Sequence, residues 1–576
     1  MQKQFIFSIY FFVSFFCSLF AQTSYPKDYF RAPINFPLKL AGNFGEIRTN
    51  HFHAGFDIRT DGKEGVPVYA VADGYISRIR ISAYGYGKAL CITHPNGYVS
   101  VYAHLRNFNP VLQNFTKNIQ YKLEKFEFDT LLSKNTLSVM KGDLIAFSGN
   151  TGGSEAPHLH FEMRDEKTEM PINPYFFGYK VQDAIKPTIT KLVVYPMDET
   201  TTINNKKLLK KIIPIRVNDK YSVSKTDTLL ISGKVGFGIG CYDKENNSGQ
   251  NAVFSIEMQE GGKRLFYCEF EKFSFENARY VNAYIDYLQK QKNKETIQKC
   301  FLSKNNLLGI YKNVVNNGFI NFNDDDIHLV TFIVKDYVGN TTEWVVKIKS
   351  AVPKKSTMPL QSKSENKLDC LKEFEFSNDE IKILIPAYSL YDDIAFKYTK
   401  KPKSINTFSN LQQIFDENTA SQKTYSLKIK TIGLPISLQN KACIVLSEKK
   451  AKHRYEGGVY SNGWVTTETK NFGQFTIMID TVAPTIHLAI KKKENATIVD
   501  YRSFKEIRIV VKDNLSGIKN YRATIDDKWV LCEYDYKKSM LIYLFDEAIL
   551  SGIHQFKIEV TDDKKNTNWL TFNFKK

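Results

Sequence analysis

The chain has 576 residues, of which 43% are hydrophobic and 14% aromatic. This composition is ample for packed cores and argues against a disordered chain, and the length suffices for about four domains. The formal net charge of +18 favours an anionic partner such as a cell-wall polymer or a membrane surface, although a lysine-rich solvated surface explains it equally well.

The N-terminus is typical of a secretory signal peptide over residues 1–21. Lys3 supplies a positive start, residues 5–20 form an apolar run, and Ala21 is a small residue at the expected cut. The apolar run is short for a membrane anchor, and a bulky residue precedes Cys17 where a lipoprotein needs a small one. We therefore expect an exported protein of the periplasm or cell envelope, or a secreted one, with no stable membrane span and no nucleic-acid partner.

The cysteine pattern indicates neither a disulfide framework nor a thiolate zinc site. Seven cysteines follow the signal segment, which is an odd number, and none forms a CxxC pair. We expect most of them to be buried as small apolar residues. One alternative stays open at this point, a disulfide among Cys241, Cys268 and Cys300.

Residues 22–185 are predicted to form an antiparallel β domain, because short alternating runs are separated by turn signals. The segment 65–81 breaks at Asp73-Gly74, which predicts a hairpin, and Pro95-Asn96-Gly97 predicts a second one. The polar stretch at about 106–139 has a partly helical pattern and is interpreted as an insertion between strands.

The rest of the chain is predicted to be mainly β, in modules without clustered histidines. We expect β-sandwich modules at 186–350 and 370–482, a Pro/Ser/Lys-rich linker at 351–369 between them, and a C-terminal module at 483–576.

A weak internal repeat marks the ends of two of these modules. Each ends in an apolar strand, an aspartate, a polar turn, an asparagine and a tryptophan. Asp336, Asn340 and Trp344 match Asp562, Asn566 and Trp569, with one spacing different by a residue. The repeat favours sandwiches of the immunoglobulin-like kind, for which spacing or solubility is the simplest role.

Two histidine clusters lie in the first predicted domain. His53 and Asp57 are four residues apart in HFHAGFD, and His158 and His160 are two apart in HLH. Even separations along a strand place side chains on one face, so the two clusters predict a metal site. Zinc accepts three such ligands and keeps a fourth position for water. Strand parity alone also allows His51, and it does not say which histidine of HLH touches the metal; His94 is interpreted as structural.

Three sequence blocks resemble the lysostaphin-type (LytM-like) family of zinc peptidoglycan endopeptidases. The blocks GNFGEIRTNHFHAGFDI, VYAHL and GNTGGSEAPHLHFE appear in the order of that family, within about residues 36–178. The resemblance implies one zinc ion per chain, peptidoglycan as the partner and an N-terminal metallopeptidase fold. It implies His53, Asp57 and His160 as zinc ligands, and His104 and His158 as catalytic histidines.

The same resemblance removes His51 from the ligand set and implies a hydrolytic mechanism. One of His104 and His158 takes the proton of the attacking water, and the pair stabilises the oxyanion and the leaving amine. No HExxH helix offers a glutamate base. Glu162 has the strand parity of the HLH histidines, which suits a residue that orients one of them, with a surface salt bridge as the alternative. Asn43 and Arg48 are weaker candidates for the substrate groove.

Two rival functions remain at the level of the sequence. Some members of the resembled family lack zinc ligands and activate other wall hydrolases, whereas every motif position is filled here. Two histidines and a carboxylate also describe the facial triad of Fe(II) oxygenases, which an exported protein and two further histidines disfavour. The sequence does not identify the bond that is cut, the oligomeric state or the role of the β modules.

Overall fold

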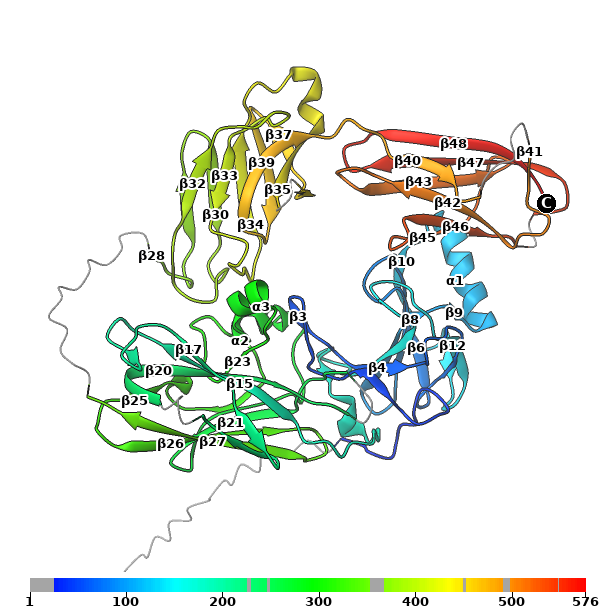
Figure 1. Ribbon diagram of the computed structural model, residues 1–576. Coiled ribbons are helices and arrows are strands. Elements are labelled where there is room, and N and C mark those ends of the chain that lie inside the picture. The colour runs from blue at the N-terminus through cyan, green and yellow to red at the C-terminus, as the bar shows by residue number, and fades with distance from the viewer. Residues whose placement is uncertain are drawn as a thin grey trace, which may run out of the picture.

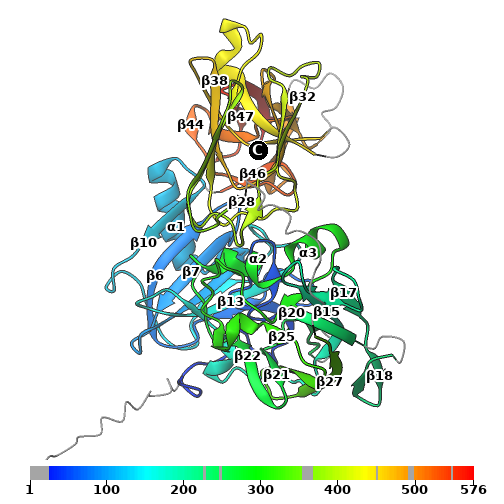
Figure 2. The same ribbon diagram turned by 90° about the vertical axis from the view of Figure 1, so that its left-hand side faces the viewer.

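The computed structural model describes residues 25–224, 229–245, 249–352, 367–448, 452–490, 498–546 and 549–576. The predicted signal peptide and most of the predicted linker at 351–369 lie outside these ranges. The described chain forms four β units that follow one another around a ring, with the last unit returning to the first (Figures 1 and 2). No helix within the described ranges is long and apolar enough to cross a membrane.

The first unit is built on one large antiparallel sheet and a small one. In order across the large sheet, its strands are β1 (Leu40–Gly42), β4 (Phe56–Arg59), β13 (His158–Asp165), β8 (Tyr98–Leu105), β7 (Lys88–Thr93), β6 (Gly74–Ile81) and β10 (Phe128–Leu131), with β11 (Ser138–Val139) on β6 and β14 (Pro171–Ile172) on β13. The small sheet has the order β5 (Pro67–Tyr69), β12 (Leu144–Phe147) and β9 (Asn107–Phe108). The fold is thus mainly β, as predicted.

One of the two predicted hairpins is present and the other is not. β7 and β8 pair antiparallel across the turn at 95–97. The prediction at Asp73-Gly74 was wrong, because β5 pairs with β12 and β6 pairs with β7 in the other sheet. Gly74 is required there by packing, since a Cβ would lie 2.4 Å from the Thr93 carbonyl oxygen. The turn carries the chain from one sheet to the other.

The stretch between β9 and β12 contains a helix, as its pattern indicated. Helix α1 (Pro110–Leu123) begins with proline at its first position, and the Asn109 side chain caps it by accepting a hydrogen bond from Leu112 N. Glu124 ends the helix in a left-handed conformation. β10 and β11 then extend the sheet at β6, so the insertion enlarges the edge away from β4.

The second unit is a strongly bent sheet around a large core. In order, its strands are β17 (Lys210–Ile212), β15 (Thr188–Pro196), β20 (Leu229–Tyr242), β27 (Thr341–Ser350), β26 (Ile327–Lys335), β21 (Ser255–Glu260), β22 (Lys263–Glu269) and β24 (Tyr311–Val314). The short helices α2 (Val281–Tyr284) and α3 (Tyr287–Asn293) lie between β22 and β24 in the chain.

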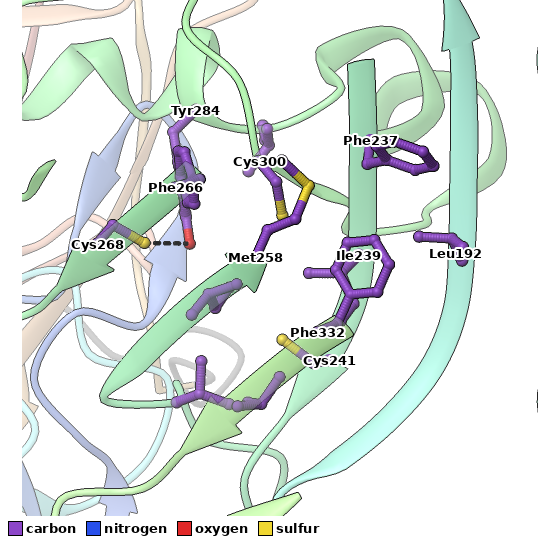
Figure 3. Packing of buried hydrophobic residues seen from close by; sticks show 14 of the residues in the cluster. Leu192, Phe237, Ile239, Cys241, Met258, Phe266, Cys268, Tyr284, Cys300 and Phe332 are labelled. Atoms are coloured by element: carbon purple, nitrogen blue, oxygen red, sulfur yellow. Dashed lines mark hydrogen bonds between the residues drawn. The ribbon is translucent and has the colours of Figure 1, made fainter. Parts of the chain in front are cut away.

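Cysteines are part of the apolar core of this unit. Cys241, Cys268 and Cys300 lie among its buried residues (Figure 3), and Cys268 Sγ is 3.9 Å from the Tyr284 hydroxyl. All three are free thiols, so the disulfide left open by the sequence does not form. Burial raises the pKa of Cys268 to about 12, which keeps the thiol neutral and unreactive.

The third and fourth units each consist of two sheets that share one core. In the third unit, the first sheet has the strand order β29 (Phe374–Ser377), β30 (Ile381–Ile385), β34 (Tyr425–Lys430), β38 (Trp464–Thr469) and β37 (Val459–Ser461). Its second sheet has the order β32 (Tyr398–Lys401), β33 (Leu411–Ile414), β39 (Gly473–Ile479), β35 (Ala442–Ser447) and β36 (His453–Tyr455). In the fourth unit, the first sheet has the strand order β40 (Thr485–Leu488), β42 (Glu506–Lys512), β46 (Met540–Leu544) and β45 (Cys532–Asp535). Its second sheet has the order β41 (Ile498–Asp500), β48 (Thr567–Lys575), β47 (Ile553–Asp562), β43 (Ile518–Ile525) and β44 (Lys528–Trp529).

The internal repeat corresponds to equivalent hairpin turns in the second and fourth units. Asp336 accepts hydrogen bonds from the backbone and side chain of Asn340, and Asp562 does the same for Asn566. The two tryptophans are not equivalent. Trp344 is fully buried and Trp569 is 65% exposed, because the one-residue difference in spacing moves the side chain to the opposite face of its strand.

The fourth unit closes the ring by packing on the first (Figure 1). Lys88 of β7 pairs with Glu533 at 2.7 Å, and Lys117 of α1 pairs with Asp546 at the same distance. Lys537 Nζ donates a hydrogen bond to the Ser154 carbonyl oxygen at 2.8 Å. The loop that precedes β13 in the first unit is therefore in contact with the fourth unit.

Candidate metal centre

The pairing of β4 with β13 brings the two motif clusters together. Asp57 and His160 are direct partners in the antiparallel register, so their side chains point to the same face of the sheet. Their neighbours Phe56 and Phe161 point to the other face, where both are fully buried in the core. The alternation that buries the phenylalanines thus fixes the direction of the carboxylate and the imidazole.

His53 reaches the same point from a loop. His53 and Asp57 would share a face of one strand if residues 53–57 were extended, but the chain turns between β3 (His51–Phe52) and β4. Gly55 sits in this turn, and a Cβ there would lie 2.1 Å from the Phe161 carbonyl oxygen. The close passage over β13 places His53 Nε2 3.0 Å from His160 Nδ1.

His53, Asp57 and His160 form a compact donor set for one metal ion. Asp57 Oδ1 lies 2.9 Å from His53 Nε2 and 2.9 Å from His160 Nδ1, and all three residues are buried. Atoms this close can each contact one ion at about 2.0–2.2 Å. His51 is outside the set, because its side chain is exposed and its Nδ1 lies 2.9 Å from the Thr49 carbonyl oxygen.

Each histidine of the donor set is held through its other ring nitrogen. His53 Nδ1 lies 2.7 Å from the Asn43 carbonyl oxygen, and His160 Nε2 lies 2.8 Å from Glu162 Oε1. Both oxygens are acceptors, so we assign the ring N–H to these nitrogens, which leaves the other nitrogen of each ring to face the centre.

The carboxylates at and behind the centre are kept ionised. Burial disfavours the charge on Asp57, but the neighbouring imidazoles of His53, His158 and His160 outweigh it and hold its pKa well below the usual range. Arg48 also donates to Asp57 Oδ2 at 2.9 Å. Glu162 is fully buried, and Arg164 and His160 lower its pKa to about 2 against the effect of burial.

His104 and His158 flank the donor set. Their rings are 4.9 Å apart, and the His104 ring is 5.7 Å from that of His160. His104 is the next-to-last residue of β8 and has a left-handed conformation, with φ of 57°, a strained geometry that occurs at functional sites. Burial and the neighbouring histidines lower its pKa to about 3, so the ring is neutral at pH 7.

The loop before β13 orients this second pair. His104 Nδ1 donates to the Thr151 carbonyl oxygen at 2.9 Å, and His158 Nδ1 donates to that of Ala156 at 2.8 Å. The remaining nitrogen of each ring is then an acceptor. His158 Nε2 is buried, has no hydrogen-bond partner within the described residues, and lies 3.2 Å from Asp57 Oδ1.

Several functional contacts were not visible in the sequence. Tyr86 donates to Glu162 at 2.6 Å from a loop without any motif, and Arg164 donates to the same carboxylate at 2.7 Å. Of these two residues, only Arg164 could have been inferred from the sequence, because alternation along the strand places it on the same face as Glu162. The candidates Asn43 and Arg48 support the centre itself through the contacts above. His94 is structural, with its ring nitrogens on Asp73 O and Ser100 Oγ.

A buried β-sheet site of two histidines and an aspartate, flanked by two more histidines, defines a metallopeptidase-like centre. Residues 51–117 match the family model of peptidase family M23, and residues 365–480 match that of a Zu5-like domain. The chain therefore contains an N-terminal M23 domain of lysostaphin type, which confirms the resemblance and the fold class predicted from the motifs.

The curated relatives reported below match about a quarter of this chain. The DD-carboxypeptidase/endopeptidase Mpg of Neisseria meningitidis is 34% identical over 22% of this chain and 23% of its own length. The murein hydrolase activator NlpD of Salmonella typhimurium is 31% identical over 25% and 30%, respectively. The chain thus spans less than a third of the length of either relative. The catalytic domain of lysostaphin from Staphylococcus simulans is 24% identical over 25% of this chain and 93% of its own, with a TM-score of 0.19.

Proposed function

We propose that this protein is an exported zinc metalloendopeptidase that hydrolyses peptide cross-links of bacterial peptidoglycan. The observation that carries the proposal is the complete donor set of His53, Asp57 and His160, with the imidazoles of His104 and His158 beside it. A zinc ion held there would lower the pKa of a water molecule and polarise the scissile carbonyl.

The protein's own residues supply the proton transfer. His104 is neutral at pH 7 because of burial and its histidine neighbours, and its Nε2 is free to accept, since its Nδ1–H is engaged by the Thr151 carbonyl oxygen. His158 has the same arrangement on Ala156. One of the two takes the proton of the attacking water, and the resulting imidazolium stabilises the oxyanion and passes the proton to the leaving amine.

The second candidate is a binding protein that activates another wall hydrolase. It is favoured by the relatives, which include a murein hydrolase activator as well as endopeptidases. The site disfavours this candidate, because a protein that binds the cell wall without hydrolysing it needs neither the complete metal donor set nor the strained backbone of His104.

The test is digestion of purified peptidoglycan by the zinc-loaded full chain, with released fragments identified by mass spectrometry. We expect peptide cross-links to be cut, and we expect His104→Ala to abolish the release. His453→Ala is the matched control, because His453 is an exposed histidine of the third unit. Zinc-loaded protein that releases nothing alone, but increases release by a separate wall hydrolase, would establish the activator instead.

A further inference from the structure

Three aspartates from distant parts of the chain meet where the second unit joins the first. Asp183 lies in the connection before β15, Asp243 directly follows β20, and Asp336 directly follows β26. One carboxylate oxygen of each lies within 4.8 Å of the other two. Asp243 and Asp336 are only 2% and 3% exposed, so this is not a solvated acidic patch.

The cluster lines a small cavity. Asp183, Asp243 and Asp336 all contribute to its wall, and its volume is about 10 Å³, room for one water-sized sphere. Asp243 Oδ1 is buried and has no hydrogen-bond partner within the described residues. A buried carboxylate oxygen without a partner is costly, which requires that something positive or protonated complete the site.

Within the described residues, no basic side chain is among the main influences on the pKa of Asp243 or Asp336. Burial raises the pKa of Asp243 to about 8, and the neighbouring Asp183 and Asp336 carboxylates add to the rise. The pKa of Asp336 is also raised, by burial and then by Asp183, against its hydrogen bonds from the Asn340 turn. The pKa values of both carboxyl groups are set mainly by burial, by the other carboxylates and by neutral hydrogen-bond donors.

We propose that Asp183, Asp243 and Asp336 bind a calcium ion. Carboxylate oxygens are hard ligands, and no histidine or cysteine belongs to this trio. Calcium accepts six to eight oxygens in irregular geometry, with water and backbone carbonyls in the remaining positions. Magnesium demands a near-ideal octahedron, which three carboxylates from separate chain segments are less suited to provide.

The same placement recurs where the fourth unit follows the third. Asp480 precedes Pro484 by four residues, as Asp183 precedes Pro187, and Asp513 and Asp562 occupy the positions after β42 and at the end of β47. Their oxygens also lie within 4.8 Å of one another, and Asp513 Oδ1, like Asp243 Oδ1, has no partner within the described residues. The arrangement is therefore built twice in one chain. Asp513 is less buried, so the proposal concerns the first cluster.

The first cluster lies directly behind the metal centre. Asn43 lines the same cavity and exchanges two 2.9 Å hydrogen bonds with the backbone of Ala252, while its carbonyl oxygen accepts from His53. Tyr175 stacks on Tyr337 at 4.6 Å. Calcium at this position fixes the second unit against the segment that orients His53.

The test measures calcium binding by the calcium-depleted, zinc-loaded full chain with titration calorimetry. We expect Asp243→Asn to bind one calcium ion fewer per chain than the wild type. Asp183→Asn is the second variant, because Asp183 is only partly buried and its replacement leaves the core intact. Asp325→Asn is the matched control, since Asp325 is an exposed aspartate of the same unit, with its side chain 81% exposed. Equal calcium numbers in the wild type and both site variants would overturn the proposal.

Thermal unfolding gives an independent measurement. Calcium at about 10 mM should raise the Tm of the wild type and of Asp325→Asn by several degrees, because it binds only the folded chain. It should leave Asp243→Asn unchanged, and without calcium that variant should match or exceed the wild-type Tm, since one repelling charge is gone. A wild-type Tm that does not respond to calcium, or that rises more with magnesium, would contradict the assignment.

Discussion

Glu162 Oε1 accepts a hydrogen bond from His160 Nε2 at 2.8 Å while carrying an ion pair with Arg164 on its other oxygen. The glutamate is fully buried, so a charge pair from the interior of the sheet orients a histidine of the candidate donor set. Such partners govern metal affinity as well as geometry.

Replacing this glutamate should weaken zinc binding. Glu162→Gln keeps the shape but removes the charge that faces His160, and we expect the zinc affinity to fall about 10–100-fold. Competition with a zinc-binding dye measures the change. Glu166→Gln, an exposed glutamate just beyond β13, serves as the control. Unchanged affinity in Glu162→Gln would mean that the hydrogen bond does not tune the ligand.

Replacing a histidine of the donor set and replacing a flanking histidine should have different effects on zinc content. His160→Ala removes a donor of the trio, so we expect loss of both zinc and hydrolysis. His104→Ala leaves the donors in place and should retain zinc while hydrolysis falls at least about 100-fold. Metal content by mass spectrometry and release of peptidoglycan fragments are the two measurements. Equal metal loss in both variants would overturn the division of roles.

Zinc uptake should depend on pH. Burial lowers the pKa of His160, but its hydrogen bonds with Asp57 and Glu162 outweigh this and raise it to about 9 in the metal-free protein. Below about pH 9 the ring therefore carries a second proton, on Nδ1, that zinc must displace. We expect the apparent zinc affinity to rise up to about tenfold per pH unit between pH 6 and 8. Calorimetry in buffers of different ionisation enthalpy counts the released proton, and a pH-independent affinity would contradict the assignment.

Gly55 should be intolerant of any side chain. A Cβ there would lie 2.1 Å from the Phe161 carbonyl oxygen, so Gly55→Ala must push the loop away from β13 and His53 away from His160. We expect loss of zinc and a destabilisation of about 3 kcal/mol or more. Gly309→Ala is the control, because a Cβ at Gly309 meets nothing within 4 Å. A Gly55→Ala protein with normal zinc content would show that the close approach is unnecessary.

The ring should open when its buried ion pair is broken. Glu533→Gln leaves the Lys88 ammonium, whose side chain is 8% exposed, without a charged partner at the contact between the first and fourth units. We expect a cost of about 2 kcal/mol or more and a larger radius of gyration in small-angle X-ray scattering. Arg522→Gln is the control, because its pair with Glu124 is about half exposed on both sides and is worth less than about 1 kcal/mol. Equal scattering from both variants would show that this pair does not hold the ring closed.

Local patterns in the sequence were sufficient for several elements. The turn at 95–97 and the helix after Asn109 follow from the turn and capping preferences of single residues, which act over a few positions. The three motif blocks contained all five histidine and aspartate residues of the centre. Strand parity predicted correctly that His158 and His160 share a face, because side-chain alternation is a property of each strand by itself.

Contacts between distant segments had no comparable signal. Side-chain alternation along the sequence did not reveal that His53 lies in a loop or that Asp73-Gly74 joins two different sheets. It also gave no indication that Tyr86 donates a hydrogen bond to Glu162. The repeat drew attention to Asp336 and Asp562, yet nothing local indicated that Asp183 and Asp243 lie beside Asp336.

The amino-acid sequence by itself thus determined the chemistry of this protein, through which residues carry imidazole and carboxylate groups and at what spacing. The tertiary structure alone decided which of those groups share a point in space. The reason is physical: strand register and packing between units depend on segments more than a hundred residues apart, and a one-residue change in register turns every side chain of a strand to its other face.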